Sequence, residues 1–391
     1  MGELDFKYVI DTFFALFSMV LIIFMVPGFA MLEAGLVRTK NVTAVLTTNV
    51  MIYAIASTAF LLLGYQLAFG SWEKVEYSMW AAFLFQMAFV GKTINIMSGG
   101  VSERVRMIPL ALFAIIMGGV IYPLIVNVTW GANLLKGTLL ELNMFDLAGS
   151  TVIHSTGGWA LLAAILVIGS RKDRYKNDMI KVIPASNIPL VVLGALLLWI
   201  GWFGFNGGSV GSISTKEAAD SVALTVLNTN TAGLAGAIVA GVIMYLRYRL
   251  FDITMILNGA LGGLVAITAG ANLYDIHTPL LIGAIGGALV VFAVPFFDKL
   301  KLDDPVGALS VHLVNGIWGT LAVGIFVEKI SFLDQLKGVA VIAVFAFVVS
   351  YIVIFAINKL IAFRAEDDIQ LQGLDVNECG VEAYPEFKRA I

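Results

Sequence analysis

The stretch DLAGSTVIH at residues 146–154 recurs as DPVGALSVH at residues 304–312. In both copies a glycine follows the aspartate after three positions and a histidine follows it after eight. Each copy leads into an apolar stretch, and the second of these is the fifth such stretch after the first. Copies that lie an odd number of membrane crossings apart run in opposite directions, which is typical of an inverted repeat.

The composition of the chain supports a membrane location. Of its 391 residues, 59% are hydrophobic and only 13% are charged, which is far from the balance of a soluble domain. Stretches long enough to cross a hydrocarbon core, about 20 helical residues each, recur between short polar breaks. We expect eleven spans, at 8–36, 42–69, 77–101, 106–128, 146–169, 187–210, 218–246, 253–272, 278–297, 305–327 and 334–363.

The basic residues predict the orientation of these spans. Most of them crowd into alternate loops: Arg38, Lys40, Arg104, Arg106, Arg171, Lys172, Arg174, Lys176, Lys181, Arg247, Arg249, Lys299 and Lys301. The intervening loops hold only Lys74, Lys136, Lys216 and Lys329. Because basic loops stay in the cytoplasm, we expect the N-terminus outside and the C-terminus inside.

The predicted fold class is therefore an all-α integral membrane protein of eleven transmembrane helices. It comprises two inverted five-helix repeats, at about 8–169 and 187–327, and a final long helix at about 334–363. Residues 1–363 form the transmembrane domain and residues 364–391 a cytoplasmic tail. The single cysteine excludes an internal disulfide. The net charge of −3 gives no sign of a nucleic-acid partner.

Two of the three histidines fall inside predicted spans. Eight helical residues rise about 12 Å, which brings His154 and His312 from opposite faces to near the middle of the membrane. A lone buried histidine is usually a core residue with satisfied hydrogen bonds, but a pair placed by an inverted repeat favours a functional contact between the imidazoles. The third, His277, is predicted in an outer loop.

The two aspartates of the motif open their helices, where a carboxylate can accept unpaired backbone N–H groups. We expect Asp304 to act as a cap. For Asp146, at the outer end of the same helix as His154, an electrostatic attraction for a cation is an equal alternative.

Several motifs together resemble the Amt/MEP/Rh family of ammonium transporters, and the chain is similar to its archaeal or bacterial members. The resemblance rests on the two motif copies, on Ser102-Glu103-Arg104, on GWFGFNGGS at 201–209, on Asp303-Asp304-Pro305, and on the tail segments Gly373-Leu374-Asp375 and Ala383-Tyr384.

This resemblance implies roles for particular residues. Trp130, Ser209 and Phe89 would form an outer ammonium site, and Phe89 and Phe205 would be two stacked rings that gate a pore. His154 and His312 would line that pore and relay protons. On the residues alone, Trp130 would be a membrane-interface aromatic, the phenylalanines would be packing, and Ser209 would be a helix-end cap.

The resemblance also implies a transporter or channel in the cell membrane, without enzymatic activity or cofactor. Ammonium would lose its proton, and ammonia would cross with or without that proton. The expected partners are ammonium, lipid, two further copies in a homotrimer, and a PII-type signalling protein at the cytoplasmic face. Lys92, one turn beyond Phe89, departs from the expected apolar pattern.

Two alternatives stay open at this point. The chain could be a proton-coupled carrier or channel for another small solute. Two histidines on facing helices could also ligate a haem.

Overall fold

The computed structural model describes residues 3–71, 75–176 and 179–387. Lys74, used above for orientation, and the last four residues of the predicted tail lie outside the described residues.

Helices dominate the structure along the described chain. Its first half contains α1 (Glu3–Ile23), α2 (Met25–Leu36), α3 (Val42–Ala59), α4 (Tyr65–Phe69), α5 (Met79–Gly100), α6 (Met107–Ile116), α7 (Tyr122–Thr129) and α8 (Thr156–Ile168). Its second half contains α9 (Ile188–Gly208), α10 (Lys216–Tyr248), α11 (Ile253–Ile267), α12 (Thr278–Lys299), α13 (Asn315–Phe326), α14 (Phe332–Leu360) and α15 (Asp367–Gln372).

Short elements connect or extend these helices. Five wide π-helical turns span Phe60–Gly64, Met117–Ile121, Ser150–Ser155, Leu309–Val314 and Asp375–Cys379, and 3-10 turns span Thr39–Asn41 and Pro385–Phe387. Strands β1 (Tyr175–Lys176) and β2 (Met179–Ile180) pair antiparallel, with Tyr175 opposite Ile180.

Ten of the predicted spans are present in the described residues as helices long and apolar enough to cross a membrane. The predicted span at 253–272 is shorter, because α11 ends at Ile267 and the chain then turns, with the Gly270 N–H donating to the Ile267 carbonyl. Together α1 and α2 form the first span. The α-helix is interrupted at Phe24, three residues before Pro27. Proline removes a backbone donor and is a common cause of such breaks.

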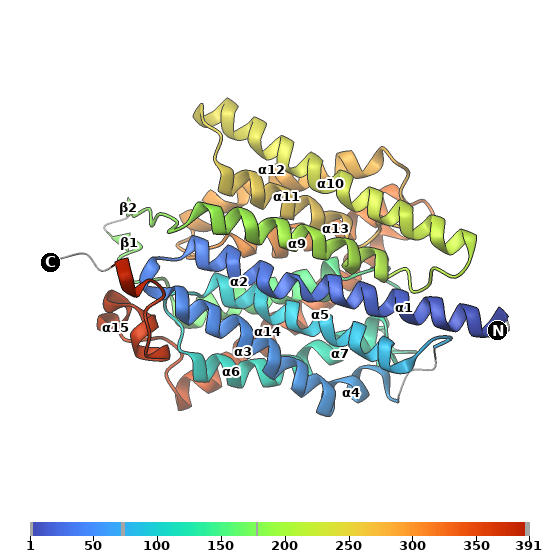
Figure 1. Cartoon of the computed structure of the whole chain (residues 1–391), viewed down its shortest axis with the longest axis horizontal. Coiled ribbons are helices and arrows are strands. Elements are labelled where there is room, and N and C mark those ends of the chain that lie inside the picture. The colour runs from blue at the N-terminus through green and yellow to red at the C-terminus, as the bar shows by residue number, and fades with distance from the viewer. Residues whose placement is uncertain (1–2, 72–74, 177–178, 388–391) are drawn as a thin grey trace.

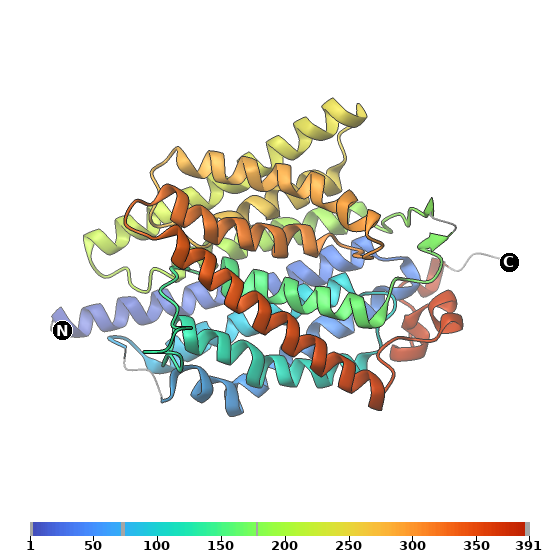
Figure 2. The same ribbon diagram turned by 180° about the vertical axis from the view of Figure 1, so that it is seen from behind.

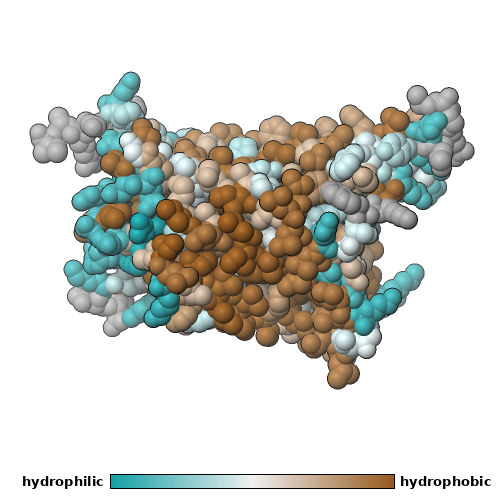
Figure 3. Space-filling model, turned by 90° about the horizontal axis from the view of Figure 1, so that it is seen from below, coloured by the Kyte–Doolittle hydropathy of each residue, from teal (hydrophilic) through white to brown (hydrophobic). Residues whose placement is uncertain are grey.

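The helices run roughly along one direction and form a bundle (Figure 1). α1 begins at one end of the bundle, and α15 lies at the other end beside β1 and β2. α10, α11 and α12 pack together on one side, α2 packs against α9, and the long α14 crosses α8 on the opposite face (Figure 2). An apolar band covers the middle of the surface between polar ends (Figure 3), as expected of a chain surrounded by lipid.

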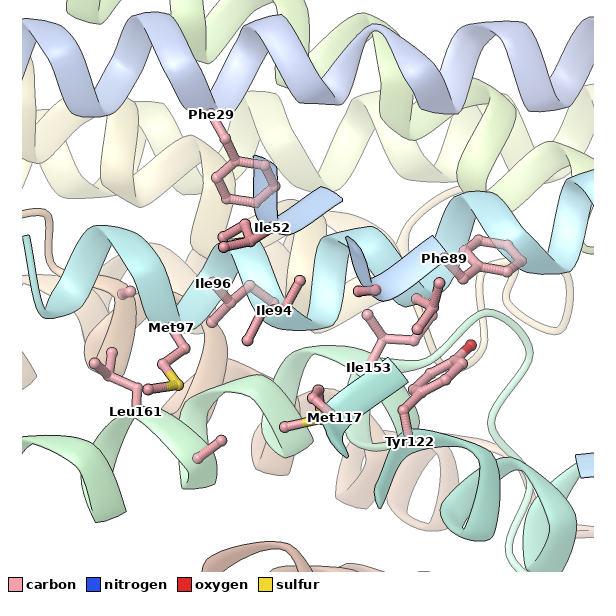
Figure 4. Close-up of a cluster of buried hydrophobic side chains, with 14 of the residues drawn as sticks. Phe29, Ile52, Phe89, Ile94, Ile96, Met97, Met117, Tyr122, Ile153 and Leu161 are labelled. Atoms are coloured by element: carbon pink, nitrogen blue, oxygen red, sulfur yellow. The ribbon is translucent and has the colours of Figure 1, made fainter. Parts of the chain in front are cut away.

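The interior is a continuous apolar core around α5. Figure 4 shows Phe89 near one end of this core and Met97 and Leu161 towards the other, with Ile94 of α5 between them. All of these side chains are buried. The core therefore extends along the direction in which the helices cross the membrane.

The helices that follow the two motif aspartates start later than predicted. The spans expected at 146–169 and 305–327 begin at Ser150 and Leu309. Gly149 and Gly307 have φ values of 107° and 80°, in the region that glycine adopts most easily, and they turn the chain into the helix. The estimate of eight helical residues between aspartate and histidine is therefore wrong, because half of that interval is a non-helical turn.

Candidate functional site

The carboxylate of Asp146 caps the turn that carries His154. Its oxygens accept N–H groups from four consecutive residues at 2.8–3.0 Å: Gly149, Ser150, Thr151 and Val152. Asp146 is 4% exposed. The first N–H groups of a helix have no partner within the helix, so this one side chain satisfies the whole first turn.

Asp304 caps the second turn in the same way. It accepts the N–H groups of Val306, Gly307 and Leu309 at 3.2, 3.0 and 2.7 Å. Both aspartates are thus caps, and each holds a π-helical turn that contains one histidine. π-helical turns are rare and often occur at functional sites.

The two histidines meet between these turns. Their Nδ1 atoms lie 3.1 Å apart, and their rings are nearly parallel, with centroids 5.2 Å apart and planes inclined by 16°. His154 and His312 are 2% and 4% exposed. The short contact requires one Nδ1 to donate and the other to accept. The repeated motif predicted this meeting of the imidazoles.

A row of aromatic rings leads from the histidines towards Trp130. The ring centroids of Trp130 and Phe89 are 6.4 Å apart, those of Phe89 and Phe205 are 4.6 Å apart, and those of Phe205 and His154 are 5.4 Å apart. Phe89 and Phe205 meet edge to face, at 80°, so the expectation of two stacked rings is wrong. An edge-to-face pair is favoured because the positive edge of one ring meets the negative face of the other.

Two hydrogen bonds fix the outer end of this row. Trp130 donates its indole N–H to the Asp146 carbonyl oxygen at 2.7 Å, which ties the ring to the first motif copy. Ser209 donates its hydroxyl to the Phe205 carbonyl oxygen at 2.8 Å. The Ser209 oxygen therefore keeps its lone pairs as acceptors.

Two further side chains contact these rings without having been assigned roles from the sequence, and a third lines a cavity beside His312. Trp202 stacks on His154 with centroids 5.0 Å apart and donates its N–H to Thr268. Phe29 lies 6.1 Å from the ring of His312. Glu33 lies on the same helix as Phe29 and is 1% exposed. For Glu33 the sequence contained a signal, because a carboxylate stands inside an apolar span. For Trp202, which lies within the segment 201–209, nothing in the sequence indicated a contact with His154.

The ammonium group of Lys92 lies beside the Tyr53 ring. Its side chain is 1% exposed, and its ammonium group lies 5.0 Å from the centroid of the Tyr53 ring on α3. Within the described chain, its Nζ atom has no hydrogen-bond acceptor. The contact with the face of the Tyr53 ring is a cation–π interaction.

A buried ion-pair cluster closes the end of the bundle near the tail. Arg171 contacts Asp303 at 2.8 Å and Glu103 at 3.1 Å, and Arg38 contacts Glu103 at 2.9 Å. Burial alone would raise the pKa of Asp303, but the guanidinium groups of Arg104 and Arg171 outweigh it and hold that pKa well below its usual range. The pKa of Glu103 is also lowered on balance, because Arg171 and Arg38 outweigh its burial.

The histidine pair does not fit the haem alternative. The direct contact of 3.1 Å between Nδ1 atoms leaves no space for a porphyrin and its iron between the rings. Among the residues that the structure describes, no group of three or more His, Cys, Asp or Glu side chains is close enough to hold a metal.

The bundle, its apolar belt and its buried histidine pair define a multi-pass helical membrane protein. Residues 13–384 match the Ammonium Transporter Family. The chain is 33% identical over 420 residues to the ammonium transporter Amt2 of Archaeoglobus fulgidus, which covers 97% of this chain and 89% of that protein. It is 33% identical over 393 residues to Amt1 of Methanocaldococcus jannaschii, with 96% and 97% covered.

Solved structures agree with this result. A structure described as a Sensor Amt Protein superposes with a TM-score of 0.88 at 31% identity and covers 96% of this chain and 99% of its own. Mep2 of Saccharomyces cerevisiae gives a TM-score of 0.82 at 26% identity, with 93% and 91% covered. The chain belongs to the ammonium transporter family. It is a multi-pass cell-membrane protein that transports ammonium and is not an enzyme.

Proposed function

We propose that Trp130, Ser209 and Phe89 receive ammonium at the outer end of the aromatic row. A cation over an indole ring gains about 0.5–2 kcal/mol. The Ser209 oxygen is left as an acceptor because its proton is donated to Phe205, which suits a cation that donates hydrogen bonds. Potassium has a similar charge but donates none. The site selects ammonium by its hydrogen bonds and recruits it weakly.

Phe89 and Phe205 form the gate below this site. Both rings are buried, and they touch with centroids 4.6 Å apart. A bare cation loses its hydration in such an apolar contact at a high free-energy cost, whereas neutral ammonia does not. Ammonium therefore loses its proton near the gate, and ammonia continues beside the histidines.

His154 and His312 line the path and share a proton. The observation that carries this step is the Nδ1 contact of 3.1 Å, because a donor and an acceptor in direct contact form a proton-transfer unit. The proton either returns outward, so that only ammonia crosses, or follows through the pair, so that charge crosses as well. Asp146 supports the unit by fixing the turn that holds His154.

The test combines methylammonium uptake with current recording in proteoliposomes. We expect the double variant His154→Ala/His312→Ala to lose the ammonium-evoked current. His277→Ala is the matched control, because His277 is exposed at the start of α12, and it should keep the wild-type current. An unchanged current in the double variant contradicts the relay. Equal uptake of potassium or another small solute would favour the rival carrier function.

The proposed architecture has eleven crossings, with inverted repeats at about 8–169 and 187–327 and a final helix at about 334–363. The transmembrane domain would be residues 1–363, and the cytoplasmic tail residues 364–391. Support comes from the two capped turns, whose backbone geometry is alike, and from α1 and α15 lying at opposite ends of the bundle. Labelling single cysteines introduced at each end from one side of the membrane tests the orientation.

At the assembly level the proposal is a homotrimer with one pore per subunit and a PII-type protein at the cytoplasmic face. Support for a docking role of that face is the ordered tail, in which Asp375 accepts the Ala44 N–H at 2.9 Å. A groove of about 430 Å³ lies beside it, lined in part by Lys40, Asp375 and Tyr384. Native mass spectrometry tests the trimer, and a pull-down from native lysate tests the partner.

A further inference from the structure

Glu33 is a buried carboxyl group that the proposed mechanism does not use. It lies on α2, and its two oxygens accept hydrogen bonds from the Asn49 amide at 2.8 Å and the Ser98 hydroxyl at 3.3 Å. No cation pairs with it among the described residues. Ionisable side chains inside membrane spans are costly and are commonly retained to carry ions or protons.

A glycine on the neighbouring helix makes room for this carboxyl group. A Cβ atom added at Gly99 would lie 3.0 Å from both Cδ and Oε1 of Glu33, which is too close for an ordinary contact. The polar contacts then continue away from Glu33, because Asn95 donates to the Asn49 amide oxygen at 2.7 Å. The carboxyl group is thus held in place by neutral groups.

Two small cavities meet at Glu33. The first, of about 20 Å³, is lined by Glu33, His312, Asn95 and Asn258 among apolar side chains. A volume of this size admits about one water molecule, which needs two to four polar partners. The buried Asn95 Oδ1 atom accepts no hydrogen bond from the described residues. This cavity therefore offers a polar place for water between the imidazole and the carboxyl group.

The second cavity lies on the other side of Glu33, towards the tail. It also measures about 20 Å³ and is lined by Glu33, Ser98, Ser102, Glu103 and Glu378. The buried hydroxyl of Ser102 has no hydrogen-bond partner within the described part of the chain. Glu378 belongs to the tail and is partly exposed. Among the described residues, Glu33 is the only ionisable side chain that lines both cavities.

We propose that Glu33 accepts the proton from His312 and releases it to the cytoplasmic end. The inference rests on the proposed function, and it concerns the proton that follows ammonia through the pair. Nδ1 of His312 faces His154, so Nε2 is the nitrogen available to the first cavity. His312 takes the shared proton from His154 on Nδ1 while its Nε2–H bond breaks. The electron pair of that bond stays on Nε2, so the ring is left neutral, and one water passes the proton to a Glu33 oxygen. The new O–H bond then breaks towards the second cavity, which restores the carboxylate.

The test separates charge transfer from ammonia transfer in Glu33→Gln. Proteoliposomes receive an ammonium gradient while current and internal pH are recorded together. Ammonia that enters with a proton carries current and leaves the internal pH unchanged, whereas ammonia alone takes up an internal proton and raises that pH. We expect the variant to lose about 100-fold in current, at the lower end of what a positioned proton-transfer group contributes, and to gain the internal pH rise.

Two further variants serve as controls. Glu33→Asp keeps a carboxyl group and should restore part of the current. Asp252→Asn is the matched change of acid to amide, because Asp252 caps α11 and lines neither cavity, and asparagine caps helices equally well. It should keep the wild-type current.

Several outcomes would overturn the inference. They are a wild-type current in Glu33→Gln, a loss of both current and internal pH rise in that variant, or a wild-type protein that passes ammonia without any current. The proposed function fails separately, if the double histidine variant keeps its current. If the double histidine variant loses its current and Glu33→Gln keeps it, only the role of Glu33 is refuted.

Discussion

The two copies of the repeated motif share a backbone and differ in their surroundings. In each, an aspartate caps a π-helical turn behind a left-handed glycine, and a histidine points to its counterpart. The copy with His154 adjoins Trp202, Phe205 and Trp130, whereas the copy with His312 adjoins Phe29 and the cavity of Glu33. The repeated backbone thus supplies two matched imidazoles, and the divergent neighbours give the two sides different chemistry.

The largest expected effect separates the two capping aspartates. Asp146→Ala leaves four N–H groups of a buried turn without an acceptor. Each unpaired group costs about 1–3 kcal/mol, so we expect the free energy of unfolding to fall by at least about 4 kcal/mol. Asp304 caps its turn in the same way but is only partly buried, so water can reach the freed N–H groups and Asp304→Ala should cost less unfolding free energy. Thermal unfolding in detergent measures both. An equal loss of stability in the two variants would show that the difference in burial does not affect what each cap contributes.

The second copy has an additional acid, Asp303, where the first has Phe145. Asp303 is fully buried against Arg171 and Arg104. Removing one partner of a buried ion pair leaves an uncompensated charge, so Asp303→Asn should cost about 3 kcal/mol, measured by the same unfolding assay. Phe145→Leu is the matched change in the first copy and should cost less.

The lowered pKa of Asp303 also predicts how this cost depends on pH. Because the folded-state pKa lies below the usual value of about 4, the stabilisation is complete above that value and is lost as the pH falls through the folded-state pKa. The difference in thermal unfolding midpoint between wild type and Asp303→Asn should therefore be constant from pH 7 to about pH 5 and should become smaller below about pH 4. A difference that narrows near neutral pH would contradict this assignment.

A smaller effect is expected at the aromatic end of the row. Trp130→Leu removes a cation–π partner worth about 1 kcal/mol, which corresponds to a rise of about fivefold in the apparent KM for methylammonium. The maximal rate should change less, because the gate and the histidines are intact. Trp80→Leu is the control, since Trp80 is 59% exposed at the start of α5. An equal rise in both variants would indicate a general effect on the membrane interface.

The sequence predicted the positions of most spans and the meeting of the imidazoles, because hydrophobic length and motif spacing depend on few physical constraints. It did not predict that Gly149 would delay the helix, since backbone turns depend on local hydrogen bonds that spacing does not report. It also missed the edge-to-face contact of Phe89 and Phe205, because side-chain direction is set by packing. Glu33 was visible as an acid inside an apolar span, but its role could not be predicted, because its cavities arise only when distant helices come together.

Lys92 belongs to neither copy of the motif. Its ammonium group is buried beside the Tyr53 ring without an acceptor in the described chain. The cation–π contact gives about 0.5–2 kcal/mol, whereas burying an ammonium group costs several kcal/mol. Lys92→Met keeps the length of the side chain and removes that cost, so unfolding should shift towards higher stability by about 1 kcal/mol. The methylammonium KM should stay unchanged, and a clear fall in KM would mean that Lys92 repels the cation from the path.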